Sequence, residues 1–302
     1  MSSKLIQRPI IILAAPRSGS SLLLQILSAH SDLWSLYEES HDVLAQFHPS
    51  NRNWESNVLT EADLDESTRL RLERSFYERS GNLERLPLAH LIPLRGRGRF
   101  GRPISALSRW FRHPPIRIVE KTPHNALRIP FLRALFPDAQ FLHLTRDPRT
   151  NIPALYRSWL NPDRYLAFPL WNGFRIEGFH GSHWAFILPP RWRELNGRPL
   201  ADICAVQWRA ANEMPLEHLE GLPPSRVLRT RYEDLMSETV RELARIATWA
   251  ELDPKPFRRF SKNLPRINAT RSRHAAEWTM PEDELDRVLP MVTDIAARLG
   301  YP

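Results

Sequence analysis

The sequence has little cysteine, little lysine and no long apolar run. Its single cysteine, Cys204, cannot form an internal disulfide, and one thiolate is too few for a Cys-rich zinc site. The apolar run near the N-terminus, residues 10–15, is far shorter than the ~20 residues that span a bilayer. It also lacks the basic segment and longer apolar region of a signal peptide. These absences predict a protein of the reducing cytoplasm with no membrane span.

Only four of the 42 basic residues are lysines, and the formal net charge is +8. Arginine binds phosphate and carboxylate groups through paired hydrogen bonds, so this bias suits an anionic ligand. A GC-rich genome produces the same bias without a functional cause. The densest cluster, residues 95–102, reads Arg-Gly-Arg-Gly-Arg-Phe-Gly-Arg and superficially resembles an RNA-binding tract. A solvated loop is the simpler interpretation of so short a run, and we expect no nucleic-acid partner.

The first forty residues predict a strand, a turn and a helix. Residues 9–16 form a continuous apolar run, which is typical of a strand buried on both faces of a parallel sheet. Residues 20–30 place their leucines on one helical face. A helix is also predicted over 126–136, and further strands are predicted over 117–121, 140–145 and 226–232. This alternation predicts an α/β fold with a parallel sheet and right-handed crossovers.

The rest of the chain reads as insertions into a single domain, residues 1–302. Residues 42–115 are helical and polar in pattern, and a capping box of Thr60 and Asp63 predicts a helix that runs to about residue 79. Residues 161–200 are rich in aromatic side chains but show little periodicity. Such a cluster suits either core packing or a pocket for an apolar ligand.

Two amphipathic helices are predicted near the C-terminus. The first covers about residues 238–250. The second follows a capping signal of Thr279 and Glu282 and continues to Leu299. Cys204 lies in an apparent helix, where it is most simply a small buried hydrophobe.

The turn after the first strand reads Ala-Pro-Arg-Ser-Gly-Ser-Ser over residues 15–21. A turn of this kind directs backbone N–H groups and the positive end of a helix dipole at one point. Arg17 adds a charge, and hydroxyl donors come from Ser18, Ser20 and Ser21. The turn therefore predicts a phosphate cradle, with an ordinary strand-to-helix turn as the alternative.

The same turn lacks what a nucleoside triphosphate requires. A P-loop carries a lysine that reaches the β- and γ-phosphates, and a first glycine that opens the loop. Here Ser20 takes the place of the lysine and Ala14 that of the glycine. A nucleotide with a single 5′-phosphate group that carries a substituent fits this loop better than ATP.

With these residues in view, the chain resembles the sulfotransferases that use 3′-phosphoadenosine 5′-phosphosulfate (PAPS), of bacterial type and with similarity to protein-tyrosine sulfotransferases. Five segments match in the expected order along nearly the whole chain. They are Pro-Arg-Ser-Gly-Ser-Ser-Leu at 16–22, Val-Glu-Lys-Thr-Pro at 119–123, Phe-Leu-His-Leu-Thr-Arg-Asp-Pro-Arg at 141–149, the segment 227–235, and Leu-Gly-Tyr at 299–301. The resemblance implies a P-loop-like three-layer fold with a central parallel sheet, helical insertions and C-terminal helices.

The resemblance also implies which residues hold the donor. It assigns the 5′-phosphosulfate group to the loop and the 3′-phosphate to Arg146. The loop residues concerned are Arg17, Ser18, Gly19, Ser20 and Ser21. One position departs from the family pattern, because a second 3′-phosphate ligand, usually serine, is replaced by Ala154. Ser158 lies one helical turn later, and Arg271 is a candidate to compensate.

Sulfuryl transfer to an alcohol requires removal of the hydroxyl proton and stabilisation of charge on the sulfuryl group and the leaving phosphate. Lys121, at the carboxyl end of a predicted strand, is the candidate for charge stabilisation, and Arg17 shares that task. The resemblance aligns Glu39 with the catalytic glutamate of protein-tyrosine sulfotransferases. His124 and His41 are the alternatives, since cytosolic members use a histidine. Neither the chemistry nor the sequence calls for a metal.

The sequence does not identify the acceptor. The candidates are an acyl or polyketide hydroxyl (free or carrier-bound), a glycolipid, a phenol and a peptide tyrosine. The aromatic stretch leans slightly toward something apolar. Two other functions compete with this interpretation. One is a nucleotide or small-molecule kinase, and the other is a degenerate nucleotide-binding or RNA-binding protein without catalysis. The sequence does not indicate an oligomeric state.

Overall fold

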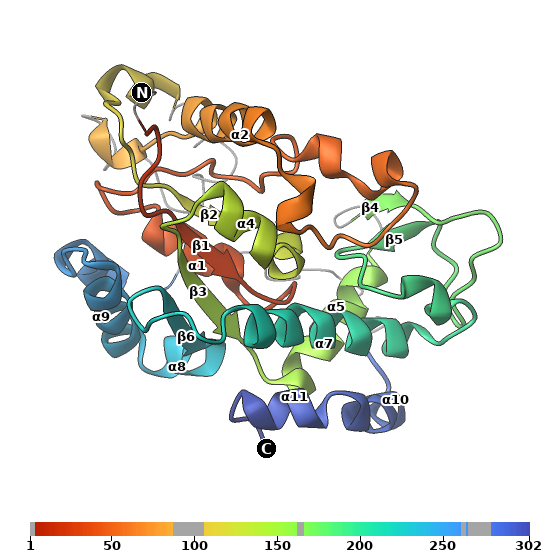
Figure 1. Cartoon of the computed structure of the whole chain (residues 1–302). Helices are drawn as coiled ribbons and strands as arrows, with labels where there is room; N and C mark the ends of the chain where they lie inside the picture. Colours follow the sequence, from red (N-terminus) through yellow and green to blue (C-terminus); the bar gives the residue numbers. More distant parts are fainter. Residues whose placement is uncertain (1–3, 87–105, 162–165, 261–263, 265–278) are drawn as a thin grey trace.

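The computed structural model describes residues 4–86, 106–161, 166–260, 264 and 279–302 (Figure 1). Its centre is a four-stranded parallel sheet in the order β2-β1-β3-β6. The strands are β1 (Ile10–Leu13), β2 (Val119–Lys121), β3 (Gln140–Thr145) and β6 (Val227–Arg231). Each falls within a range predicted from the sequence. The α/β fold with a central parallel sheet is thereby confirmed.

Helices cover both faces of this sheet because successive strand residues point to opposite sides. Ile10 and Ile12 pack in one core with α1 and α9, whereas Ile11 and Leu13 pack in another with α2 and α4. All four strand residues are completely buried, which explains the continuous apolar run. The helices are α1 (Ser20–Leu27), α2 (Glu66–Arg79), α4 (Ile129–Leu135) and α9 (Thr239–Ala250).

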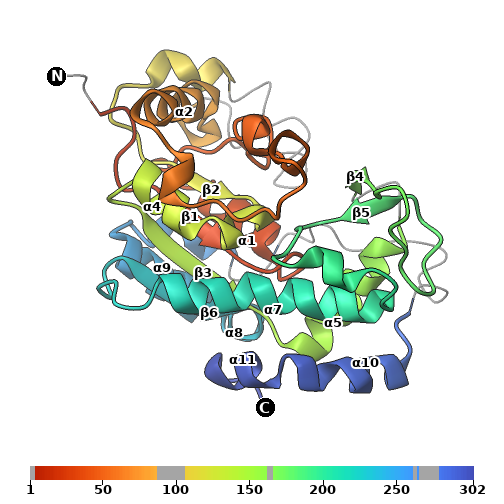
Figure 2. The same cartoon turned by 45° about the vertical axis from the view of Figure 1, so that its right-hand side comes forward.

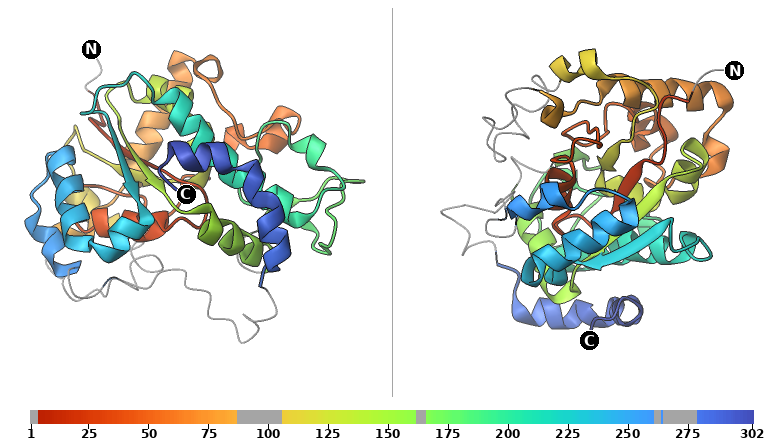
Figure 3. Two further views of the ribbon diagram at one scale, coloured as in Figure 1. Left: turned by 90° about the horizontal axis from the view of Figure 1, so that it is seen from below. Right: turned by 90° about the vertical axis from the view of Figure 1, so that its left-hand side faces the viewer.

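A third core lies beside the sheet and is built around α7 (Leu200–His218). Cys204 is fully buried there, as predicted. The C-terminal helices lie against α7, as Figure 3 shows, and a two-stranded antiparallel hairpin, β4–β5, projects beyond it (Figure 2). The remaining elements of this region are α5 (Pro148–Trp159), β4 (Leu166–Pro169), β5 (His183–Ala185), α8 (Tyr232–Ser237), α10 (Glu282–Val288) and α11 (Thr293–Arg298).

Two helix predictions near the sheet need correction. The capping box of Thr60 and Asp63 is present, but it starts a single 3₁₀ turn, and α2 begins later with Asp65 as its N-cap. The helix predicted over 126–136 is interrupted at Arg128, whose φ of −124° is not helical. The described 3₁₀ helices are η1 (Ala45–Phe47), η2 (Pro49–Arg52), η3 (Glu61–Asp63), η4 (Leu83–Arg85), η7 (Ala106–Phe111), η8 (Pro123–Leu127), η9 (Trp192–Leu195), η10 (Lys255–Phe260) and η11 (Leu289–Met291).

The last predicted helix is also divided. Pro281, not Thr279, precedes its first residue, and the helix breaks at Leu289 before α11 begins. Pro290 explains the break, because proline has no N–H for the helical hydrogen bond and its ring clashes with the preceding turn. The described part of the insertion over 42–115 contains α2 and otherwise short 3₁₀ turns, so it is less helical than the pattern predicted.

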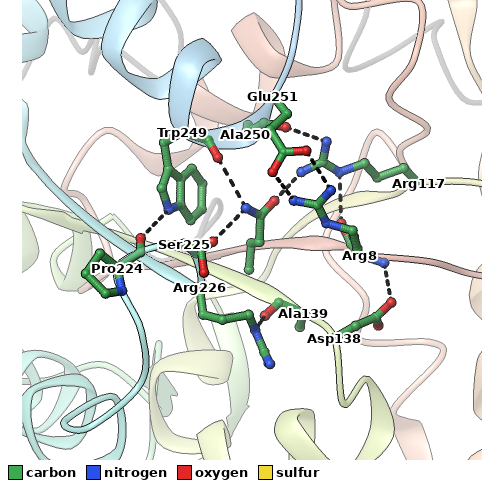
Figure 4. A network of polar contacts seen from close by, with 11 residues as sticks. Arg8, Arg117, Asp138, Ala139, Pro224, Ser225, Arg226, Trp249, Ala250 and Glu251 are labelled. Atoms are coloured by element: carbon green, nitrogen blue, oxygen red, sulfur yellow. Dashed lines mark hydrogen bonds and ion pairs between the residues drawn. The ribbon is translucent and has the colours of Figure 1, made fainter.

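A partly buried polar network closes the amino end of the sheet (Figure 4). Arg117 donates hydrogen bonds to the carbonyl of Arg8 (2.9 Å), the carbonyl of Ala250 (2.6 Å) and the side chain of Gln140. Gln140 in turn donates to the carbonyl of Ser225 (2.8 Å), and burial lowers the pKa of Arg117 to about 10. These bonds join β2, β3 and α9 at the amino ends of the strands. A site built from residues that follow the strands lies at the opposite, carboxyl ends.

Candidate active site

The predicted site residues converge at the carboxyl ends of the strands. The loop 16–21 follows β1, Lys121 ends β2, and Arg146 directly follows β3. Since β1 lies between β2 and β3, these three segments are neighbours at one edge of the sheet. Ligands of open α/β sheets bind at this edge.

The loop has a backbone that depends on glycine at one position. Gly19 has φ +91° and is the N-cap of α1. A Cβ atom there would lie 2.5 Å from the ring of Tyr232, so a side chain is excluded by both conformation and space. Arg17 adopts a left-handed φ of +67° without being glycine. Strain of this kind costs about 1–3 kcal/mol and is found mostly at functional sites.

The side chain of Asn151, in α5, fixes the phosphate loop 16–21 by two hydrogen bonds. Its side-chain amide donates to the carbonyl of Pro16 (2.9 Å), and its carbonyl accepts the hydroxyl of Ser18 (2.8 Å). Ser18 and Asn151 are both fully buried. The first turn of α1 has no acidic residue and no side-chain cap, which leaves the N–H groups of Ser20 and Ser21 for another acceptor. The loop is therefore rigid, uncapped and suited to an anion.

Arg146 contacts this loop directly. Its Nη1 donates to the carbonyl of Arg17 (2.9 Å), its Nε donates to Thr150 (3.0 Å), and its guanidinium lies 4.7 Å from the centre of the Tyr232 ring. The same ring packs on Gly19. The arginine predicted to bind a 3′-phosphate is thus fixed beside the loop predicted to bind a 5′-phosphosulfate.

Lys121 and Glu39 form an ion pair across the site. Lys121 Nζ lies 2.5 Å from Glu39 Oε1, and the lysine side chain is 5% exposed against 35% for the glutamate. Burial disfavours the charged form of Glu39, but the attraction of Lys121 and hydrogen bonds from His41 and Lys121 outweigh burial and hold the pKa of Glu39 well below its ordinary value. Glu39 is therefore a carboxylate in this structure.

A buried polar contact fixes the two partners of this pair. Ser40 N donates to Thr122 Oγ1 (2.7 Å), and Thr122 Oγ1 donates to Glu120 (2.6 Å). Ser40 follows Glu39 in the chain and Thr122 follows Lys121, so this contact aligns the two segments. Glu120 also accepts from Asn125, and burial raises the pKa of Glu120. Glu120 thus stabilises the segment 122–125 through Thr122 and Asn125. Lys121 forms its ion pair with Glu39 and not with the neighbouring Glu120.

Both candidate histidines lie next to this ion pair. His41 Nε2 is 2.8 Å from Glu39 Oε2, and the rings of His41 and His124 meet edge to face with centroids 4.8 Å apart. His124 is buried, and burial, followed by repulsion from His41 and Arg128, lowers its pKa well below the ordinary value. Its Nδ1 is buried without a hydrogen-bond partner among the described residues.

An aromatic cluster continues from the histidines. The ring of His48 lies 5.6 Å from Phe168 and 6.1 Å from Trp54, and Trp54 lies 4.7 Å from Trp171. Burial, with repulsion from His41 and Arg128, lowers the pKa of His48, so this histidine belongs to the same electrostatic environment. Other aromatic residues of 161–200, such as Trp184, are core residues. The aromatic stretch 161–200 therefore contributes to the core through residues such as Trp184, and Phe168 also contacts His48.

Of the two residues named beside Ala154, only Arg271 is predicted to compensate for it. Ser158 donates its hydroxyl to the carbonyl of Ala154 (2.8 Å) within α5, so its hydrogen-bond donor is already used. Arg271, like the Arg-Gly segment 95–102, lies outside the described residues. Sequence reasoning missed Asn151, His48 and Tyr232. Only Tyr232 lay in a matched segment, and neither of the other two carries a local signal that separates it from an ordinary polar residue.

Two further searches bear on the site. In the ranges that the structure describes, no group of three or more His, Cys, Asp or Glu side chains is arranged to hold a metal ion. No described helix is long and apolar enough to cross a membrane.

Several solved structures are similar to this chain. A sulfotransferase domain from the curacin biosynthetic pathway is 18% identical, covers 99% of each chain and has a TM-score of 0.50. A sulfotransferase domain of the Synechococcus PCC 7002 olefin synthase is 16% identical, with 100% of this chain and 98% of that chain covered and a TM-score of 0.48. A mouse sulfotransferase complexed with PAP is 10% identical, with 96% and 84% covered and a TM-score of 0.45.

Curated protein sequences gave no match. The model of the sulfotransferase family matches residues 9–168, more than half of the 302-residue chain. This match contains the phosphate loop, the Lys121 strand and the Arg146 turn. The chain therefore belongs to the sulfotransferase family.

Proposed function

We propose that this protein transfers the sulfuryl group of PAPS to an acceptor hydroxyl. The observation that carries the proposal is the meeting of the phosphate loop, Lys121 and Arg146 at one edge of the sheet, with Arg146 bonded to the loop itself. The proposed donor ligands are Arg146 and Arg271 for the 3′-phosphate, and Arg17, Ser18, Gly19, Ser20 and Ser21 for the 5′-phosphosulfate. Uncapped N–H groups at α1 support this assignment.

The proposed reaction is an in-line displacement at sulfur. A bond forms between the acceptor oxygen and sulfur, while the bond from sulfur to the 5′-phosphate oxygen breaks and the proton of the hydroxyl is removed. Lys121 and Arg17 would stabilise charge on the sulfuryl oxygens and the leaving phosphate. Lys121 is suited to this task because it is almost fully buried at the strand end.

Glu39 is proposed as the general base that removes the proton of the acceptor hydroxyl. Its support is its position, since it is bonded to Lys121 on one oxygen and lies 2.8 Å from His41 on the other. His124, the alternative, is 8% exposed and has its pKa lowered chiefly by burial. Burial of this degree makes direct contact with an acceptor less favourable than contact with Glu39 or His41.

For the acceptor we propose a hydroxyl-bearing molecule with an apolar part, free or attached to a carrier. The support is the aromatic cluster that begins at His48 and continues through Phe168 and Trp54 to Trp171. Aromatic side chains bind apolar groups with large area and little loss of conformational entropy.

The test is thermal unfolding in metal-free buffer with adenosine 3′,5′-bisphosphate (PAP), compared with ATP and Mg²⁺. A ligand at a hundredfold its Kd adds about 2.7 kcal/mol, which for a chain of this size raises Tm by at least about 2 °C. We expect a shift with PAP that Arg146→Ala abolishes. A shift with ATP alone would favour a kinase, and a shift with neither would favour a protein without a working donor site.

A further inference from the structure

The turn that carries Arg146 is held from both sides by residues far along the chain. Thr145, the last residue of β3, has its hydroxyl 3.0 Å from the hydroxyl of Tyr301. On the other side of Arg146, the backbone N–H of Asp147 donates to Oε1 of Glu233 in α8 (3.0 Å). The residues before and after Arg146 are therefore fixed by partners 156 and 86 positions away in the sequence.

Tyr301 and Glu233 join these two contacts into one network. The Tyr301 hydroxyl donates to Oε2 of Glu233 (3.0 Å), whose Oε1 already accepts from Asp147. A tyrosine hydroxyl has a single hydrogen, so the Thr145 hydroxyl is the donor in its contact with Tyr301. Tyr301 is 3% exposed, and burial, with repulsion from Glu233, raises the pKa of Tyr301 and keeps its hydroxyl protonated. Hydrogen bonds therefore run in one direction from Thr145 through Tyr301 to Glu233.

A glycine turn brings this hydroxyl to β3. Gly300 has φ +80° and follows the end of α11. The N–H groups of Gly300 and Tyr301 donate to the carbonyls of Ala297 (3.0 Å) and Ala296 (2.9 Å). These two bonds form a Schellman motif, in which the left-handed residue is usually glycine because a Cβ atom disfavours that conformation. The Gly-Tyr pair of the matched segment 299–301 therefore ends α11 and directs the tyrosine toward the sheet.

Two arginines fix the rest of Tyr301. The guanidinium of Arg231, the last residue of β6, lies 4.3 Å from the centre of the Tyr301 ring. Arg149 Nη1 donates to the carbonyl of Pro302, the next residue (2.6 Å). Because its hydroxyl, its ring and the residue after it are each held, Tyr301 is a rigid support for the turn.

Arg146 reaches the phosphate loop from a backbone that this network fixes. Its Nη1 donates to the carbonyl of Arg17 (2.9 Å), and its own carbonyl accepts from Trp208 Nε1 (3.2 Å). A guanidinium binds a phosphate strongly when its paired N–H groups are aligned with the phosphate oxygens. A shift of the turn 145–147 would spoil that alignment, even with every residue of the loop in place.

We propose that Tyr301 is a positioning residue of the donor site, which sets the Arg146 turn so that its guanidinium receives the 3′-phosphate. The proposal rests on the proposed use of PAPS and deepens it. Since Tyr301 acts through Arg146, it should matter for a nucleotide with a 3′-phosphate and not for adenosine 5′-phosphate, whose phosphate is proposed to bind the loop. A tyrosine that only stabilised the fold would change both affinities alike, or neither.

The test is calorimetric titration of PAP and of adenosine 5′-phosphate into the unaltered protein and Tyr301→Phe. Phenylalanine keeps the ring but removes the bonds to Thr145 and Glu233. The Kd of PAP should rise by about 2–10-fold, the range for one hydrogen bond, while the Kd of adenosine 5′-phosphate stays unchanged. Thr145→Val removes the same contact from the other side and should have the same effect. Tyr77→Phe, in α2, is the matched control and should change neither affinity.

A double-mutant cycle with Arg146→Ala separates positioning from stability. If Tyr301 acts through Arg146, Tyr301→Phe should not weaken PAP further once Arg146 is replaced. Equal losses for PAP and adenosine 5′-phosphate, the same loss in both backgrounds, or unchanged binding of PAP to Tyr301→Phe would overturn the proposal. Failure of the unaltered protein to bind PAP would instead count against the proposed function, so the two failures are distinguishable.

Discussion

Replacing Glu39 with glutamine should tighten the binding of PAP while it impairs turnover. In the ligand-free protein the charge of Lys121 is balanced by Glu39 at 2.5 Å. A donor whose 5′-phosphate contacts Lys121 must compete with that carboxylate. Glutamine removes the competing charge and keeps the shape of the side chain, so the lysine is free for the phosphate.

The magnitude follows from the geometry of the pair. Two unit charges 4 Å apart interact by about 4 kcal/mol at an effective dielectric constant of about 20. Glu39 is 35% exposed, so solvent screens part of this attraction, and we discount it to about 1–2 kcal/mol. That corresponds to a Kd for PAP lower by about 5–30-fold. The ligand-free variant should also unfold at lower temperature, because it leaves a buried lysine without its partner.

Calorimetric titration of PAP into the unaltered protein and the Glu39→Gln variant measures this change. Glu217→Gln is the control, because it removes the same charge from an exposed position near the end of α7. The gain should shrink as salt is added, since screening weakens the lysine–phosphate attraction. Equal or weaker binding of PAP to Glu39→Gln would refute the idea that Lys121 contacts the donor phosphate.

Three further predictions concern the loop and the core. Arg146→Ala should weaken PAP by about 10–150-fold, as expected for a lost charged hydrogen bond, and leave the affinity for adenosine 5′-phosphate nearly unchanged; equal losses for both nucleotides in calorimetry would contradict a 3′-phosphate role. Gly19→Ala should lower the free energy of unfolding by about 1–3 kcal/mol in urea titrations, and adding Tyr232→Ala should cost less than the sum of the two single changes. Burial and repulsion from Arg229 lower the pKa of His143 to about 3, so unfolded chains take up this proton near pH 6.5 while folded ones do not. Stability should therefore fall as pH drops from 7.5 to 5.5, by about 1 kcal/mol or more, and fall less in His143→Gln.

The strands could be predicted because their signal is local. A run such as Ile10–Leu13 is apolar at every position, and only a strand covered on both faces buries such a run. The helix break at Arg128 has two causes, and one of them is local, because Pro130 stands in the first turn of α4 and cannot continue a helix from the preceding residues. The other cause is a contact that Arg128 makes far along the chain. Its guanidinium is buried and donates to the carbonyl of Asn57 (3.3 Å), 71 residues away, and this tertiary contact prevails over the helical pattern.

The residues of the site also differ in whether they could be predicted from the sequence. Residues in the matched segments, such as Lys121 and Arg146, could be named from sequence, and their meeting at one sheet edge follows from parallel topology. Their roles stay predictions. Asn151 and His48 could not be named, because their importance depends on partners distant in the chain: Asn151 holds Pro16 and Ser18, and His48 packs on Phe168.

The contact between Ser40 and Thr122 has a consequence for how such a protein can diversify. It fastens the segment of Glu39 to the end of β2, so the chain between them leaves and returns at fixed points. Changes of length or sequence in the intervening insertion can reshape the surroundings of His48 and Trp54 without shifting Glu39 against Lys121. The two halves of the site can therefore change at different rates, so that the surroundings of His48 and Trp54 vary while the pairing of Glu39 with Lys121 is kept.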